Sequence, residues 1–198
     1  MTIASMRRML VSDHDGWDEV VRTHPSIRNL ALYMVAPFSL IPAIMYPYAE
    51  LMYPGQVFAL LEPPMSTGEA MFVGIAFFLM QLAMVQMMAT FIQQIGESFG
   101  VRASDDEAYA LAAIAPTPLW LSALALFVPS LSFAIGAVAL AWIGSVALIR
   151  HGIRPLLHLD DDHKIRQMAA AVTATGVVAW MALLIVMALT VSLVLGWR

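Results

Sequence analysis

The stretch "AAIAPTPLWLSAL" (residues 112–124) places two prolines inside an apolar run that contains no charged side chain. Over all 198 residues, 61% are hydrophobic and only 12% are charged. Soluble domains average about half apolar and about a quarter charged residues. Apolar runs of roughly 18–20 residues, the length that crosses a bilayer, recur along the chain. The sequence therefore predicts an all-α, polytopic membrane bundle.

Five apolar segments are long enough to act as membrane spans, and short polar segments separate them. The predicted spans cover residues 29–49, 69–95, 108–128, 131–149 and 169–196. Residues 1–28 precede the first span and carry both charge signs, so we expect a cytoplasmic segment with a short interfacial helix at Trp17. Residues 29–198 then form a single five-helix transmembrane domain.

The basic residues predict the direction of these spans. Nine of the ten Lys and Arg residues precede span one, separate spans two and three, or separate spans four and five. Arg198 alone falls on the other side. Because basic loops are retained in the cytoplasm, we expect the N-terminus inside and the C-terminus outside.

Prolines in spans one and three form the first candidate feature. "VAPFSL" (35–40) and "IAPTPL" (114–119) share Ala-Pro and a leucine three residues beyond the proline. Pro37 and Pro116 lie at matched depths, and each removes a backbone hydrogen bond and frees a carbonyl. We expect both spans to be bent there.

Span two carries a polar stripe at helical spacing, formed by Gln86, Thr90, Gln93 or Gln94, and Glu97. One interpretation is that Gln86 hydrogen-bonds a neighbouring helix and locks the bundle. The other is a hydrated, cytoplasm-facing pocket between spans one, two and three. Gln81 is assigned to packing because it faces another direction. The predicted pocket residues are Pro37, Gln86, Thr90, Pro116 and Thr117.

Imidazoles and carboxylates gather before the fifth span. The segment offers His158, Asp160, Asp161, Asp162 and His163 as possible ligands for a divalent metal. Their spacing matches no defined ligand pattern. Acidic residues before a helix also cap it and favour its dipole, which is the alternative interpretation.

Motifs for catalysis are missing from the sequence. It contains no cysteine, which excludes disulfides and thiol chemistry, and no nucleophile-elbow, phosphate-loop or zinc-protease pattern. We expect no enzyme activity, no cofactor and no nucleic-acid partner. Two functions remain: a protein that acts through helix–helix contacts among membrane lipids, as a homo-oligomer or an accessory subunit, or a small-molecule or ion transporter.

Three stretches resemble bacterial Yip1-domain membrane proteins. They are "GWDEVVRTHPSIRNLALYMVAPFSLIPAI" (16–44), "AYALAAIAPTPLWLSAL" (108–124) and "AWIGSVALIRHGIRP" (141–155). The resemblance implies a five-helix integral membrane domain in the bacterial inner membrane, with a periplasmic C-terminus. In the eukaryotic branch it implies vesicle trafficking and contacts with small GTPases. This chain lacks the "DLYGP"-type stretch of that branch and its long polar amino-terminal domain.

Overall fold

The computed structural model describes residues 8–12, 16–56 and 65–196. Predictions that concern residues 1–7, 13–15, 57–64 and 197–198, including the placement of Arg7 and Arg198, lie outside the described residues. Within the described part all regular structure is helical, and five helices are long and apolar enough to cross a membrane. The all-α, five-span fold class is therefore confirmed.

Several spans are built from more than one helical element. The first span runs Ile27–Met52, the second Thr67–Ser98, the third Asp105–Phe127, the fourth Leu131–Leu156 and the fifth Asp162–Gly196. The elements are α2 (Trp17–Thr23), α3 (Ile27–Leu30), the π-helix η1 (Ala31–Val35), α4 (Ala36–Met52), α5 (Thr67–Ser98), α6 (Asp105–Ile114), α7 (Thr117–Ser122), the 3-10 helix η2 (Ala123–Phe127), α8 (Leu131–Leu156) and α9 (Asp162–Gly196).

Polar side chains at the loop ends start the long helices. Ser66 with Glu69 and Ser104 with Glu107 form capping boxes on α5 and α6, in which each serine accepts from the third backbone N–H and each glutamate accepts from the serine N–H. At α9, Asp161 Oδ1 accepts from the backbone N–H of His163 at 2.9 Å. These caps satisfy backbone donors that a helix leaves unpaired at its first turn.

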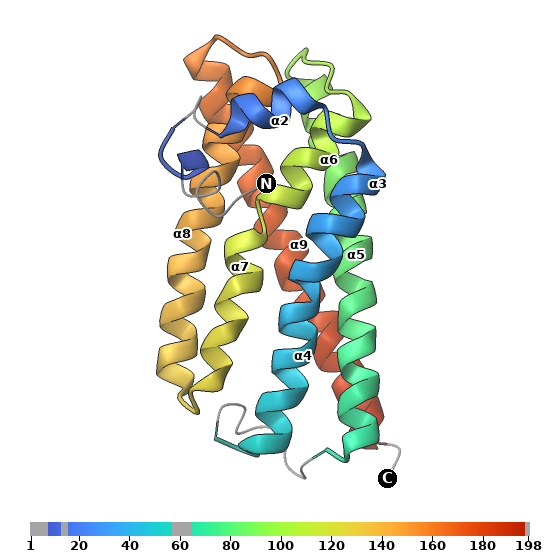
Figure 1. Ribbon diagram of the computed structural model, residues 1–198. Coiled ribbons are helices and arrows are strands. Elements are labelled where there is room, and N and C mark those ends of the chain that lie inside the picture. Colours follow the sequence, from blue (N-terminus) through green and yellow to red (C-terminus); the bar gives the residue numbers. More distant parts are fainter. Residues whose placement is uncertain (1–7, 13–15, 57–64, 197–198) are drawn as a thin grey trace.

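One end of the bundle gathers α2, the start of α3 and the α5–α6 and α8–α9 connections (Figure 1, top). We call it the basic end, because Arg22, Arg28 and Arg102 belong to these segments and Arg150, Arg154, Lys164 and Arg166 lie on the adjoining turns of α8 and α9. Polar contacts connect the segments: the Ile27 N–H donates to Asp106 Oδ1 at 3.2 Å, and His158 Nε2 lies 3.4 Å from Glu107 Oε1. The end of α4, the start of α5 and the end of α9 lie at the opposite end.

The third span is interrupted where the sequence places its prolines. α6 ends at Ile114 and α7 begins at Thr117, so Ala115 and Pro116 belong to neither helix. In the first span the π-helical turn η1 ends two residues before Pro37, and Pro42 and Pro47 lie inside α4. The helical irregularities therefore coincide with prolines, and bending of these spans stays a prediction.

The segment before the first span packs into the same core as the spans. Trp17 is fully buried, and its indole N–H donates to the Met9 carbonyl at 3.3 Å. A Cβ at Gly152 of α8 would lie 2.6 Å from the Trp17 ring, so only glycine allows this close approach. The boundary predicted at residue 28 stays a prediction about the membrane edge, since the core extends across it.

Candidate functional site

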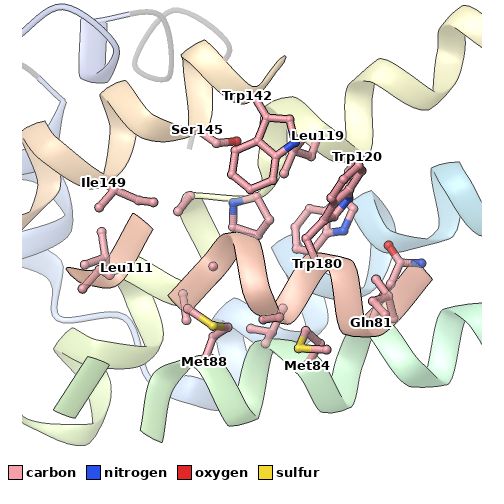
Figure 2. Close-up of a pocket in the computed structure, with 18 of the residues that line it drawn as sticks. Gln81, Met84, Met88, Leu111, Leu119, Trp120, Trp142, Ser145, Ile149 and Trp180 are labelled. Carbon is pink, nitrogen blue, oxygen red and sulfur yellow. The ribbon is translucent and has the colours of Figure 1, made fainter. Parts of the chain in front are cut away.

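A cavity of about 160 Å³ lies among the five spans. Figure 2 shows its walls, which are helical on every side that the view includes. All five spans contribute, through Pro42, Phe77, Gln81, Met84, Val85, Met88, Ile92, Leu111, Ala112, Ala115, Pro116, Leu119, Trp120, Trp142, Ser145, Ile149, Val172, Gly176, Ala179, Trp180 and Leu183.

Three tryptophans form the aromatic part of the wall. Trp142 of α8 and Trp180 of α9 meet edge to face, with ring centroids 5.5 Å apart and planes at 90°. Trp120 of α7 stacks on Phe38 at 6.5 Å, which fixes its ring from behind. These arrangements are the ones that aromatic pairs favour, so the indole faces are held in place by neighbours.

Besides the indole N–H groups of the three tryptophans, two lining side chains bring polar atoms, Gln81 and Ser145. The Gln81 amide nitrogen donates to the carbonyls of Ser39 at 3.1 Å and Phe77 at 3.3 Å. Both of its hydrogens are thereby used, which leaves the amide oxygen as its free group. Ser145 is 3% exposed, and its Oγ has no hydrogen-bond partner among the described residues.

The chemistry of this wall suits an apolar occupant. No charged side chain belongs to the described lining, so nothing would replace the hydration shell of an ion. An engineered apolar cavity of roughly 150 Å³ stays dry and binds benzene. The cavity can therefore hold a small, mostly apolar group and orient it through two polar contacts.

The five residues of the predicted pocket lie in different environments. Pro116 lines the cavity. Thr117 is buried beside it, and its Oγ1 has no partner among the described residues. Pro37, Gln86 and Thr90 are exposed and do not line it.

The polar stripe of span two was assigned to the wrong side of the helix. The buried face of α5 carries Ala70, Val73, Gly74, Gln81, Val85, Ala89, Ile92 and Gly96. Gln86 follows Val85 and is thus rotated by about 100° from that face. The lipid-facing surface of a membrane helix is apolar like its interior, so polarity did not identify the inward face. The small residues on the buried face would have identified it.

A glutamine does bond the proline-bearing first span, but it is Gln81 and not Gln86. Its acceptor, the Ser39 carbonyl, lies between Pro37 and Pro42 in the sequence. Close by, Gly74 allows α5 to approach α4, because a Cβ there would lie 2.6 Å from the Ala43 carbonyl oxygen. Span two is therefore joined to span one by a hydrogen bond and a close backbone approach.

The predicted metal ligands serve other purposes. In the described residues, no three His, Asp or Glu side chains come together as a metal-binding group. Asp161 caps α9, Asp162 pairs with Arg154, and His158 faces Glu107. The metal interpretation of His158, Asp160, Asp161, Asp162 and His163 is thus not supported, since three of them make other contacts and the described residues form no group of three ligands.

The backbone hydrogen bonds from His163 and Lys164 lower the pKa of Asp161, which favours its charged form as a cap.

Comparison with known proteins identifies a family for this arrangement of spans. Neither a curated protein nor a solved structure matches the chain. The family model described as Yip1 domain matches residues 7–189, which include the buried Trp17, the interrupted third span and all the cavity walls. The chain therefore belongs to the Yip1 domain family.

Proposed function

We propose that this protein is a non-enzymatic component of the bacterial inner membrane that assembles through the outward polar face of α5. The partner is a second copy or another membrane-protein subunit. The Yip1 family is one of membrane trafficking and organisation, and is not known for enzymes. One observation carries the proposal: a glutamine amide that faces outward from the middle of a membrane span.

Gln86 is exposed and lies twelve residues before the end of α5 at Ser98. That separation corresponds to about 18 Å along the helix, well inside a span whose 32 residues exceed the hydrocarbon thickness. The Thr90 hydroxyl, one turn on, donates to the Gln86 backbone carbonyl at 3.3 Å. The Gln86 side chain has no hydrogen bond with any described residue.

An amide in lipid is stabilised by a partner from another helix. Hydrogen bonds between membrane helices contribute about 0.6–2 kcal/mol each. Gln81 points inward and donates to the Ser39 carbonyl of the first span, whereas Gln86 points outward, where another chain can reach its amide. In a twofold dimer, two Gln86 side chains can hydrogen-bond each other, since each amide is both donor and acceptor.

Cysteine crosslinking tests this assembly, because the natural chain has no cysteine. We expect Gln86→Cys to form a disulfide-linked dimer in membranes under mild oxidation. Leu140→Cys, on the 70% exposed side chain of Leu140 in α8, is the control and should stay monomeric. We expect Gln86→Leu to shift the detergent-purified particle toward monomer, while a wild-type particle that is monomeric and co-purifies with no other protein would contradict the proposal.

The orientation belongs to the same proposal, with the basic end in the cytoplasm. It is supported by the basic residues that α2, the α5–α6 connection, the last turns of α8 and the first turns of α9 hold at that end. Asp160→Cys and Gln56→Cys place single thiols at opposite ends. In intact spheroplasts a membrane-impermeant maleimide should label Cys at 56 and spare Cys at 160; the reverse pattern would overturn the orientation.

A transporter is the second candidate function, favoured by the cavity that all five spans enclose. Its apolar wall suits an apolar solute rather than an ion. Flux of such a solute into proteoliposomes tests this function, with wild type and Gly176→Leu compared because Gly176 lines the cavity. Absence of flux in both would remove this candidate.

A further inference from the structure

We propose that the cavity binds a single six-membered ring that carries a hydrogen-bonding oxygen, as in a phenol or a quinol. The site lies between Ser145 and Gln81, with the indoles of Trp120, Trp142 and Trp180 along its length. This inference goes beyond assembly through α5 and does not depend on it, because none of these five residues is part of the outward face.

The cavity has room for about one ring, and because it is only partly enclosed, a longer molecule would extend out of it. Its volume is about 160 Å³, close to that of an engineered apolar cavity of about 150 Å³ that binds benzene. A larger head group, such as a sugar or a phosphorylated glycerol, exceeds this space and also brings polar atoms for which the lining has no partners.

The indoles favour a flat occupant over a flexible chain. Trp142 and Trp180 are fixed edge to face, and Trp120 is held by Phe38, so their rings are positioned before a ligand arrives. Aromatic pairs contribute beyond the area they bury, and pre-positioned groups bind with less loss of freedom. A hydrocarbon chain would bury apolar surface in the cavity but would make no directional aromatic contact with the indoles.

The polar atoms select for oxygen. Ser145 Oγ is buried without a partner in the described part of the chain, a state that costs free energy unless a ligand supplies the missing bond. Gln81 has both amide hydrogens occupied, so its oxygen accepts from a hydroxyl. In Figure 2 the two side chains lie toward opposite ends of the site, with indoles between them.

An occupant can enter from the membrane between α8 and α9. The cavity that these helices line is not closed on all sides. Trp142 and Trp180, which join these helices through their rings, are only half-buried. A molecule that partitions into the bilayer therefore reaches the tryptophans without crossing a polar layer.

The test compares two isosteric probes by ¹⁹F NMR on protein in lipid nanodiscs, 4-fluorophenol and 4-fluorotoluene. One carries a hydroxyl group where the other carries a methyl group. Because the two partition differently into lipid, empty nanodiscs supply the correction for partitioning. We expect wild type to bind the phenol about 3- to 10-fold more tightly, the range of one net hydrogen bond. Ser145→Ala should reduce this preference while the toluene still binds.

A variant that fills the cavity and a matched control variant show whether the probes bind in the cavity. At Gly176, which lines the cavity, an added Cβ meets no atom within 4 Å, and Gly136 offers the same free space outside it. Gly176→Leu should abolish binding of both probes, and Gly136→Leu should leave it unchanged. Thermal unfolding of each variant shows whether it is folded.

Three outcomes would overturn the inference: equal affinity of wild type for the two probes, a preference that survives Ser145→Ala, or binding that survives Gly176→Leu. Equal affinity would indicate a void for hydrocarbon chains. Where the phenol is preferred, competition separates two sources of the ring. Displacement of 4-fluorophenol by a short-chain prenylated quinol indicates a membrane quinol, and displacement by simple phenols alone indicates a small soluble one.

Discussion

The two halves of the third span differ in how much of their surface other helices bury. In α6, at the basic end, all seven residues from Ala108 to Ile114 are buried, whereas η2, Ala123–Phe127, buries none. Ala115 and Pro116 separate the halves, and both line the cavity. One apolar span thus has a packed half and a lipid-exposed half, with the cavity where they meet.

The difference follows from the neighbours of each half rather than from composition. α6 contacts α3, α5 and α8, and its alanines let those helices approach it closely. α7 and η2 contact α4 and α8, so lipid replaces protein on their remaining sides. A change of side-chain volume should therefore be costly near α6 and tolerated at the opposite end.

The largest effect that this comparison predicts is at Gly152. We expect Gly152→Ala to destabilise the protein by about 1–3 kcal/mol, the usual cost of overpacking, because the new methyl group collides with the rigid Trp17 ring and with Leu111. Gly136→Ala, on the exposed part of the same helix, should be neutral or stabilising by up to about 1 kcal/mol. Thermal unfolding in mild detergent measures both. Equal effects would show that the halves do not differ in packing.

A smaller effect is predicted for the glutamines of α5. We expect Gln81→Leu to cost about 1–2 kcal/mol, because it removes the bond to the Ser39 carbonyl that joins α5 to α4. Gln86→Leu should leave the stability of the isolated monomer unchanged, since its amide bonds no described residue. SDS titrations of the two variants measure the difference in unfolding free energy, at protein concentrations too low for oligomers to form. A greater loss of stability in Gln86→Leu than in Gln81→Leu would show that Gln86, and not Gln81, faces the interior.

The smallest effect is a pH dependence at the cap of α9. Backbone N–H groups of His163 and Lys164 lower the pKa of Asp161 in the folded state. The carboxylate therefore stabilises the fold above the ordinary aspartate pKa, and this contribution is lost as pH falls through the lowered value. Asp161 is exposed, so the effect is small and screened by salt. Melting temperatures across the acid range should decline less in Asp161→Asn than in wild type; identical slopes would contradict this role.

Much of the fold was predictable because bilayer thickness restricts apolar segments strongly. The five spans, the short helix at Trp17 and the interruption at Pro116 all follow from local sequence. The inward face of α5 could not be predicted in this way. Lipid and the protein interior are both apolar, so the polarity of Gln86 led to the wrong face. The small residues Gly74, Ala89 and Gly96 mark that face instead.

The candidate site was only partly predictable. Pro116 was identified, but Trp142 and Trp180 belong to spans that looked uniform in sequence, and they meet across 38 positions of the chain. Contacts between helices far apart in the sequence depend on the rotation of each helix about its axis and on the angle at which the helices cross. A uniformly apolar sequence contains little information about either. Ser145 is a small polar residue in an apolar span, and its unpaired hydroxyl became evident only from its surroundings in the structure.

The burial of Trp17 against Gly152 has a consequence for the timing of synthesis. The tryptophan leaves the ribosome early, but its contact surface on α8 is made about 135 residues later. At elongation rates of about 5–20 residues per second, the amino-terminal segment waits roughly 7–27 s for that surface. During this interval three spans are synthesised while Trp17 has no Gly152 to dock against. Its docking therefore follows the synthesis of the fourth span.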